Sequence, residues 1–196
     1  MTNEERRREK LRNAVLFFVK KDKTVGLTKL MKLLFYLDFR LYRETGESLT
    51  GEIYEAWHFG PVPAAVWREL RLGEDAGLNL KSVVKIIPTQ EDPRDEAAGI
   101  KLVHVPRAKF SDRYYTGREF NELKTISEMF DKVPAYRIVE ASHVKNDPWD
   151  ITIKKYGKEA KAAIDYELAL DGCDEEHKSY IHEIRDDVRL LNSILE

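Results

Sequence analysis

The stretch that decides the fold is Gly26–Leu70, GLTKLMKLLFYLDFRLYRETGESLTGEIYEAWHFGPVPAAVWREL. Its first half, residues 27–43, is apolar on nearly all sides, which is typical of a helix buried in the middle of a domain. Gly46 follows, and glycine tolerates the left-handed geometry with which many helices end. We therefore predict a central buried helix over residues 27–43, with the rest of the chain packed around it.

Two kinds of polar side chain lie on this predicted helix. At about 100° per residue, one narrow stripe carries Lys29, Lys32, Tyr36, Arg40 and Arg43. Asp38 lies almost opposite, among apolar residues, where a carboxylate needs a hydrogen-bond or charge partner. One interpretation is structural: Asp38 binds backbone N–H groups, a Trp or Tyr donor, or a His from the following turn. The other makes Asp38 part of a functional pocket.

The second half of the stretch predicts a stiff turn. Residues 49–54 are expected to form a turn or a short extended piece. Pro61 and Pro63 each fix a φ angle, and Val62 is pushed towards extended geometry because a proline follows it. Pro63 also suits the first position of a helix that continues through Leu70. Trp57 is thus expected at a fixed angle beside that helix.

The flanking segments predict a mainly α fold with a small β-hairpin. Helical patterns cover residues 4–20, 116–130 and 135–144, and Thr116 with Glu119 has the spacing of a capping box. Two β-branched runs predict a hairpin near residues 82–105. Its long tip, Gln90–Gly99, carries no motif and is expected to be a tolerated insertion.

The last segment is expected to be a helix with a heptad spacing of apolar residues at 181, 184, 188, 191 and 195. We divide the chain into a domain over residues 1–170 and a C-terminal helix over residues 171–196. That helix either packs on the domain or contacts a partner, which includes a second copy of the chain.

Composition narrows the class of protein. The chain has 196 residues, of which 42% are hydrophobic and 35% charged, and a net charge of −2. The single cysteine, Cys173, excludes an internal disulfide and a cysteine-based zinc cluster. The apolar runs are too short to span a bilayer, so we expect a cytoplasmic protein that contacts no membrane.

Several motifs together resemble the Panacea-domain family, the SocA-like antitoxins. The first is the run KLMKLLFYLDF at residues 29–39, and the others follow in order: Gly46, Leu49-Thr50-Gly51, Tyr54, Gly60-Pro61-Val62-Pro63, Ser142-His143, Trp149, Gly157 and Ile164-Asp165-Tyr166. The similarity covers roughly residues 11–170. One departure is the segment 158–163, which is longer than the family pattern leads us to expect.

The resemblance implies a bacterial or phage antitoxin that neutralises a toxin, usually encoded beside it, by direct contact. The signature residues that we expect to hold the shape of the domain are Asp38, Gly51, Tyr54, Gly60, Pro61, Val62, Pro63, His143, Trp149 and Tyr166. The side chains that we expect to contact the toxin are Lys32, Tyr36, Arg40, Trp57 and Trp67. For the aromatic residues Tyr36, Trp57 and Trp67, and above all for Trp67, the alternative is a place in the core.

Two other classes remain as alternatives. A winged-helix-like DNA-binding regulator would use the basic stripe against phosphates, but the slightly acidic net charge and the apolar helix make nucleic acid an unlikely partner. A hydrolase would need Asp38 paired with a histidine. His143 is a candidate base, metal ligand or structural donor. Because no metal-binding, phosphate-binding or nucleophile motif is present in the sequence, we expect no enzyme activity, metal or cofactor.

Overall fold

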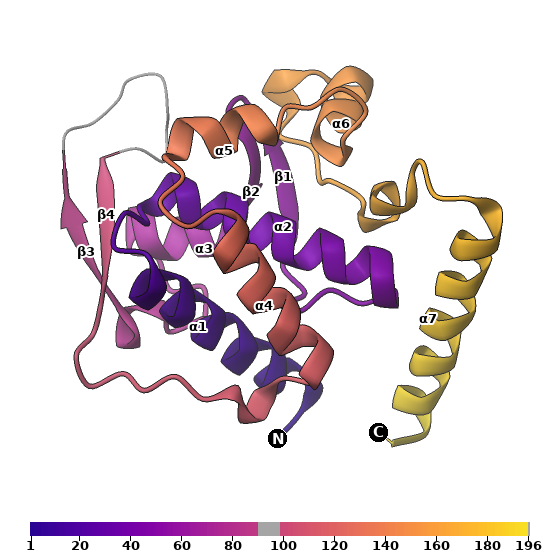
Figure 1. Ribbon diagram of the computed structural model, residues 1–196, viewed down its shortest axis with the longest axis horizontal. Coiled ribbons are helices and arrows are strands. Elements are labelled where there is room, and N and C mark those ends of the chain that lie inside the picture. Colours follow the sequence, from indigo (N-terminus) through magenta and orange to yellow (C-terminus); the bar gives the residue numbers. More distant parts are fainter. Residues whose placement is uncertain (90–98, 196) are drawn as a thin grey trace.

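The computed structural model describes residues 1–89 and 99–195, except for the side chains of residues 189 and 191–195. The predicted fold class is confirmed: the structure is 58% helical, and its described residues form seven α-helices and two small antiparallel sheets of two strands (Figure 1). The helices are α1 (Asn3–Lys21), α2 (Leu27–Thr45), α3 (Ala64–Trp67), α4 (Gly117–Met129), α5 (Ala135–Ala141), α6 (Pro148–Tyr156) and α7 (Glu175–Leu195). The strands are β1 (Tyr54–Trp57), β2 (Gly60–Pro63), β3 (Val84–Pro88) and β4 (Ile100–His104).

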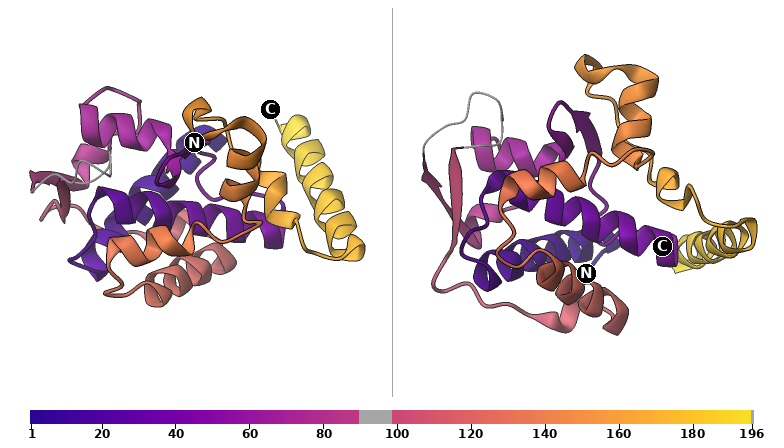
Figure 2. Two further views of the ribbon diagram at one scale, coloured as in Figure 1. Left: turned by 90° about the horizontal axis from the view of Figure 1, so that it is seen from above. Right: turned by 45° about the horizontal axis from the view of Figure 1, so that its top comes forward.

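Helix α2 is the centre of the molecule, as predicted. It contacts α1, α3, α4, α5 and α7 as well as strands β2 and β4, and Figures 1 and 2 show these elements arranged around it. Its residues 27–35 are all buried, and Gly46 ends the helix with a φ of 72°. A helix with apolar residues on nearly all sides is stable when other elements cover it on nearly all sides.

The predicted hairpin near residues 82–105 is confirmed as β3 and β4, which pair from Val84 opposite His104 to Pro88 opposite Ile100. The hairpin is joined to the connection between α1 and α2, because the Leu102 N–H donates to the Val25 carbonyl oxygen at 3.2 Å. A Cβ atom on Gly26 would lie 2.7 Å from the Ile100 carbonyl oxygen, so this close approach requires glycine. Most of the predicted tip, residues 90–98, lies outside the described residues.

A second hairpin, β1 and β2, goes beyond the turn that the sequence predicts. Its register runs from Tyr54 opposite Pro63 to Trp57 opposite Gly60. Two prolines are compatible with strand β2 because a strand at the edge of a sheet does not need every N–H donor. Pro63 then caps α3 instead of occupying its first turn, and residues 68–72 continue α3 as a π-helix that ends at Gly73.

Helix α4 begins as predicted, with a capping box at its N-terminus. The Glu119 side chain accepts from the Thr116 N–H at 2.8 Å, and the Thr116 hydroxyl accepts from the Glu119 N–H at 3.2 Å. Its apolar face, which includes the fully buried Leu123 and Ile126, packs against α2 and α1. Helix α5 then runs beside α2, and α6 begins with Pro148 at its first turn.

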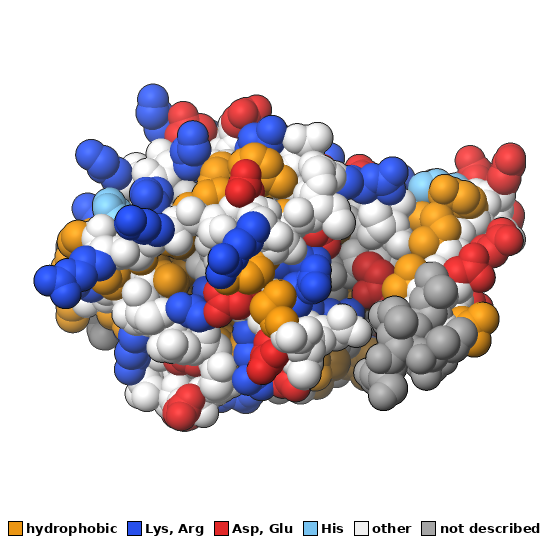
Figure 3. Space-filling view, turned by 90° about the horizontal axis from the view of Figure 1, so that it is seen from below, with side chains coloured by type: hydrophobic (Ala, Val, Ile, Leu, Met, Phe, Trp, Pro, Cys, Tyr) orange, Lys and Arg blue, Asp and Glu red, His pale blue; other side chains and the backbone are white. Residues whose placement is uncertain are grey.

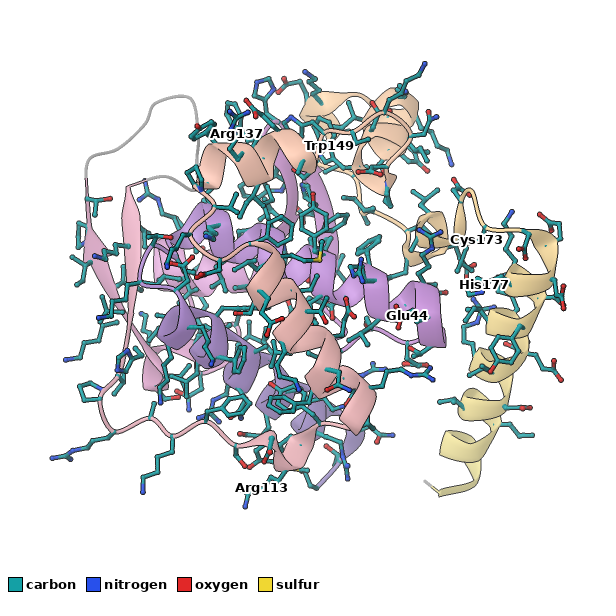
Figure 4. The ribbon with its side chains drawn as sticks, viewed as in Figure 1. Glu44, Arg113, Arg137, Trp149, Cys173 and His177 are labelled. Atoms are coloured by element: carbon teal, nitrogen blue, oxygen red, sulfur yellow. The ribbon has the colours of Figure 1, made fainter. Side chains whose placement is uncertain are left out.

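Helix α7 packs on the end of α2 through its first half. Ile181 is fully buried against Tyr42 and Leu170, and a ring nitrogen of His177 lies 2.8 Å from the Arg43 carbonyl oxygen. Figure 4 shows His177 directed from α7 towards the end of α2. The outer side of α7 carries acidic side chains, whereas the body mixes both signs of charge on the same face (Figure 3). The proposed division at residue 170 stays a prediction.

Candidate functional site

The buried carboxylate predicted on the central helix is the middle of a hydrogen-bond network. Asp38 is fully buried and accepts from the Thr50 N–H at 2.9 Å, from the Thr50 hydroxyl and from the Tyr54 hydroxyl at 2.8 Å. The Tyr166 hydroxyl lies 3.5 Å from the same carboxylate. Burial raises the pKa of Asp38, and the hydrogen bonds from Thr50 and Tyr54 oppose that rise.

This network joins the central helix to the segment that follows it and to a short helix more than 100 residues later. Thr50 lies in the loop after α2, Tyr54 begins β1, and Tyr166 begins the short helix at residues 166–170. The Tyr166 hydroxyl also donates to the Glu52 carbonyl oxygen at 2.9 Å. Gly51, with a φ of 73°, makes the tight turn between Thr50 and Tyr54. The arrangement supplies the backbone and tyrosine partners that the structural interpretation of Asp38 requires.

No histidine is among the partners of Asp38 in the described part of the chain. His143 instead stacks on Trp149, with ring centroids 4.1 Å apart and an interplanar angle of 15°. Trp149 is buried at the start of α6 (Figure 4), and its indole N–H donates to the Trp57 carbonyl oxygen at 2.8 Å. Burial, with the nearby charges of Lys32 and Lys158, lowers the pKa of His143. In the described residues, Asp38 is therefore not paired with the histidine that the hydrolase alternative would need.

Lys32, which the sequence predicts as a contact with the toxin, is buried in the structure. Its side chain is 2% exposed, and its ammonium donates to the Pro61 carbonyl oxygen at 3.0 Å. Gly60, with a φ of 99°, lies beside it: a Cβ atom there would be 2.7 Å from the Ser142 hydroxyl and 3.0 Å from the Lys32 ammonium. The Gly60–Pro63 motif thus packs against α2 and the end of α5.

Lys29, on the same predicted stripe, is 1% exposed and makes a buried ion pair. Its ammonium lies 2.6 Å from the Asp22 carboxylate and also donates to the carbonyl oxygens of Val133 at 2.6 Å and Phe130 at 2.9 Å. Hydrogen bonds from Lys29 and Thr24 lower the pKa of Asp22 against the effect of its burial. The lysines of the stripe are therefore internal connections between elements.

Of the two tryptophans predicted to contact a partner, Trp57 is buried and cannot present its ring to another protein. It is 8% exposed and packs edge-on against Trp67 with centroids 4.8 Å apart. The Lys161 ammonium lies 3.9 Å from the centroid of the Trp57 ring. Trp67 is half-buried and packs against the main core, which favours the alternative of a core role.

The remaining predicted contacts, Tyr36 and Arg40, lie together in an open groove of about 470 Å³. We call it the α2–α4 groove. Its lining comes from α2, the end of α4, the segment from the end of α5 to the start of α6, and residues 168–171. The lining residues are Phe35, Tyr36, Phe39, Arg40, Arg43, Met129, Phe130, Ala141, Asn146, Asp147, Pro148, Leu168, Ala169 and Asp171. The Tyr36 ring stacks on Phe130 at a centroid distance of 5.0 Å. The groove combines apolar walls with charged rims.

Sequence reasoning missed several residues of this groove and of its support. Arg43 was part of the basic stripe, but no local signal placed Met129, Asp147 or Asp171 beside it. Glu69, 5% exposed, was also missed; it accepts from the N–H groups of Leu78 at 3.0 Å and Leu80 at 2.5 Å. Glu69 stands between Arg68 and Arg71 in the sequence, so no local signal marked it as a buried acceptor.

The fold and the site define a mainly helical protein whose buried polar network supports an open, partly charged groove. The chain belongs to the family described as antitoxin SocA-like, Panacea domain, which matches residues 30–150. This range includes α2 from Leu30 onward, both hairpins, His143 and Trp149, whereas Tyr166 lies beyond it. No curated protein and no solved structure matches the chain.

Within residues 1–89 and 99–195, no helix is long and apolar enough to cross a membrane. The same described residues contain no group of three or more His, Cys, Asp or Glu side chains placed to hold a metal ion.

Proposed function

We propose that this protein is the antitoxin of a bacterial or phage toxin–antitoxin system and neutralises its toxin by direct binding in the cytoplasm. The observation that carries the proposal is the match of residues 30–150 to the SocA-like antitoxin family. The toxin is expected to be encoded next to it. Neutralisation through binding requires no catalytic group in this chain, and we propose that it has no enzyme activity.

The geometry of the polar groups supports a binding role. Asp38 is enclosed and bonded to Thr50 and Tyr54, so its oxygens do not face a solvent-filled site. A network of this kind fixes the positions of the elements it connects. The signature residues thus act as the support of a rigid surface, on which the α2–α4 groove is open to a partner.

The two alternative functions lose their main support in the structure. A DNA-binding role relied on the basic stripe, but Lys29 and Lys32 are buried against carbonyl oxygens and cannot reach phosphates. A hydrolase role relied on an Asp38 and histidine dyad, whereas Asp38 is bonded to threonine and tyrosine. Homodimer formation through α7 stays a prediction.

The proposal is tested by growth. The gene beside this one is expressed alone and together with this chain from separate inducible promoters. We expect the neighbouring product alone to arrest growth and co-expression to restore it. A chain with Leu30→Asp and Leu34→Asp, which places two carboxylates among fully buried residues of α2, is the unfolded control and should not restore growth. The proposal would be contradicted if the product of the neighbouring gene did not arrest growth when expressed alone. It would also be contradicted if co-expression of this chain did not relieve the arrest.

A further inference from the structure

The α2–α4 groove has the chemistry of a site for a specific kind of protein segment. Its walls are mostly apolar, and Met129 on its rim is 53% exposed. A large exposed apolar side chain beside an apolar depression is typical of a surface that another protein covers. Aromatic residues and arginine supply many of the strongest interface contacts, and Tyr36, Arg40 and Arg43 lie here together.

Two arginines of α2 contribute to the rim of the groove. Arg40 and Arg43 are three residues apart on α2 and therefore lie on the same side of the helix. Arg40 pairs with Glu122 through its Nε atom, and its side chain is 42% exposed. Arg43 is exposed, and its guanidinium forms no ion pair with the residues that the structure describes. This rim therefore has cationic groups available to an incoming carboxylate.

Asp147 and Asp171 also line the groove. Burial and the nearby Asp150 raise the pKa of Asp147. Carboxyl groups in the lining would repel a continuous chain of phosphates, which disfavours a nucleic acid as the ligand. The lining suits a protein segment that has large apolar side chains and an acidic group that can meet the arginines.

We propose that the α2–α4 groove is the toxin-docking site and that it takes a segment with one or two large apolar side chains beside an aspartate or glutamate. This inference rests on the proposed antitoxin function and specifies its partner. The apolar side chains fill the space between Tyr36, Met129 and Leu168, and the carboxylate binds Arg40 and Arg43. Charge complementarity of this kind sets specificity and the rate of association.

The test uses the full chain and, as the probe, the purified protein encoded by the adjacent gene. Arg43→Glu and Met129→Asn change exposed side chains of the groove, so both variants should keep the wild-type melting temperature. Their matched controls change exposed residues outside the groove: Arg118→Glu and Leu72→Asn, the latter at a side chain that is 56% exposed. Affinity is measured by isothermal titration calorimetry, and growth rescue is measured in parallel.

We expect each groove variant to weaken binding by about tenfold or more, while both controls bind as the wild type does. If the wild type binds the probe protein and the groove variants bind it with the same affinity, the docking site is wrong but the antitoxin function stands. A wild type that neither binds nor rescues would overturn the antitoxin function, and the docking site with it. The two failures are therefore distinguishable.

The acidic character of the bound segment has its own measurement. The exposed aspartates and glutamates of the probe protein are changed to lysine one at a time. The affinity of each probe variant is then measured for Arg43→Glu and for the wild type. We expect at least one charge reversal to restore binding to Arg43→Glu while weakening binding to the wild type. If every reversal leaves binding to Arg43→Glu unimproved, the carboxylate part of the proposal is wrong.

Discussion

The Tyr54 hydroxyl donates a hydrogen bond to the Asp38 carboxylate at 2.8 Å, and both side chains are fully buried. This contact joins the first residue of β1 to the middle of the central helix. With the two hydrogen bonds from Thr50, it replaces the water that a carboxylate loses on burial. The family signature around these residues is therefore explained by the assembly of the domain.

Changing Asp38 to Asn should mainly reduce stability. The amide keeps one oxygen but places an NH₂ group towards donors, so a buried donor loses its acceptor at a cost of about 1–3 kcal/mol. For a chain of this size, each kcal/mol lowers the melting temperature by roughly 2–4 °C. Thermal unfolding and growth rescue are measured on the same variant. Lost rescue at an unchanged melting temperature would show instead that Asp38 acts in binding.

Stability should depend on the protonation of Glu52. Burial and the nearby Asp38 raise the pKa of Glu52 from 4.5 to about 7. Between these two values the folded state holds more protons than the unfolded state, so this carboxyl makes the free energy of unfolding fall as the pH rises. We expect Glu52→Gln to remove that contribution, so that the variant gains melting temperature relative to the wild type between pH 5 and pH 8. An equal pH dependence in both proteins would refute this assignment.

Gly60→Ala and Gly157→Ala form a matched pair. Both glycines have positive φ angles, 99° and 84°, so alanine is strained at either position. Only at Gly60 does the added Cβ also meet other atoms, because nothing lies within 4 Å of the corresponding position at Gly157. We expect Gly60→Ala to lose about 1–3 kcal/mol more than Gly157→Ala, measured by urea denaturation. Equal losses would mean that the tight packing beside Ser142 is relieved at no cost.

The buried pair of Lys29 and Asp22 predicts a coupled double-mutant cycle. Removing one member leaves the other charge buried without its partner, which costs about 3–5 kcal/mol. Lys29→Met and Asp22→Asn should each be strongly destabilising, and the double variant should lose much less than the sum. Denaturant unfolding of the four proteins measures the coupling. Additive losses would show that the two side chains act independently.

The central helix could be predicted because its signal is local. Residues 27–43 are apolar on nearly all sides, and Gly46 marks the end; both features lie within one stretch of sequence. The partners of Asp38 were predicted by type, since a buried carboxylate needs donors. Their identity was not predictable, because Thr50, Tyr54 and Tyr166 reach Asp38 only when the loop and the later short helix fold back.

The basic stripe was misinterpreted for a physical reason. Helical spacing shows which side chains share a face, but it does not show what covers that face. Lys29 and Lys32 have long side chains whose ammonium groups bind carbonyl oxygens of Val133 and Pro61, far away in the sequence. The α2–α4 groove was hidden for the same reason, since its lining comes from four separate segments.

The central claim is that this protein neutralises its toxin by direct contact. The most direct measurement mixes the two purified proteins, this chain and the product of the adjacent gene, and follows the mixture by gel filtration with light scattering. The account predicts a heteromeric complex that elutes apart from either component and contains both chains. Growth rescue in cells without any complex between the purified proteins would contradict it.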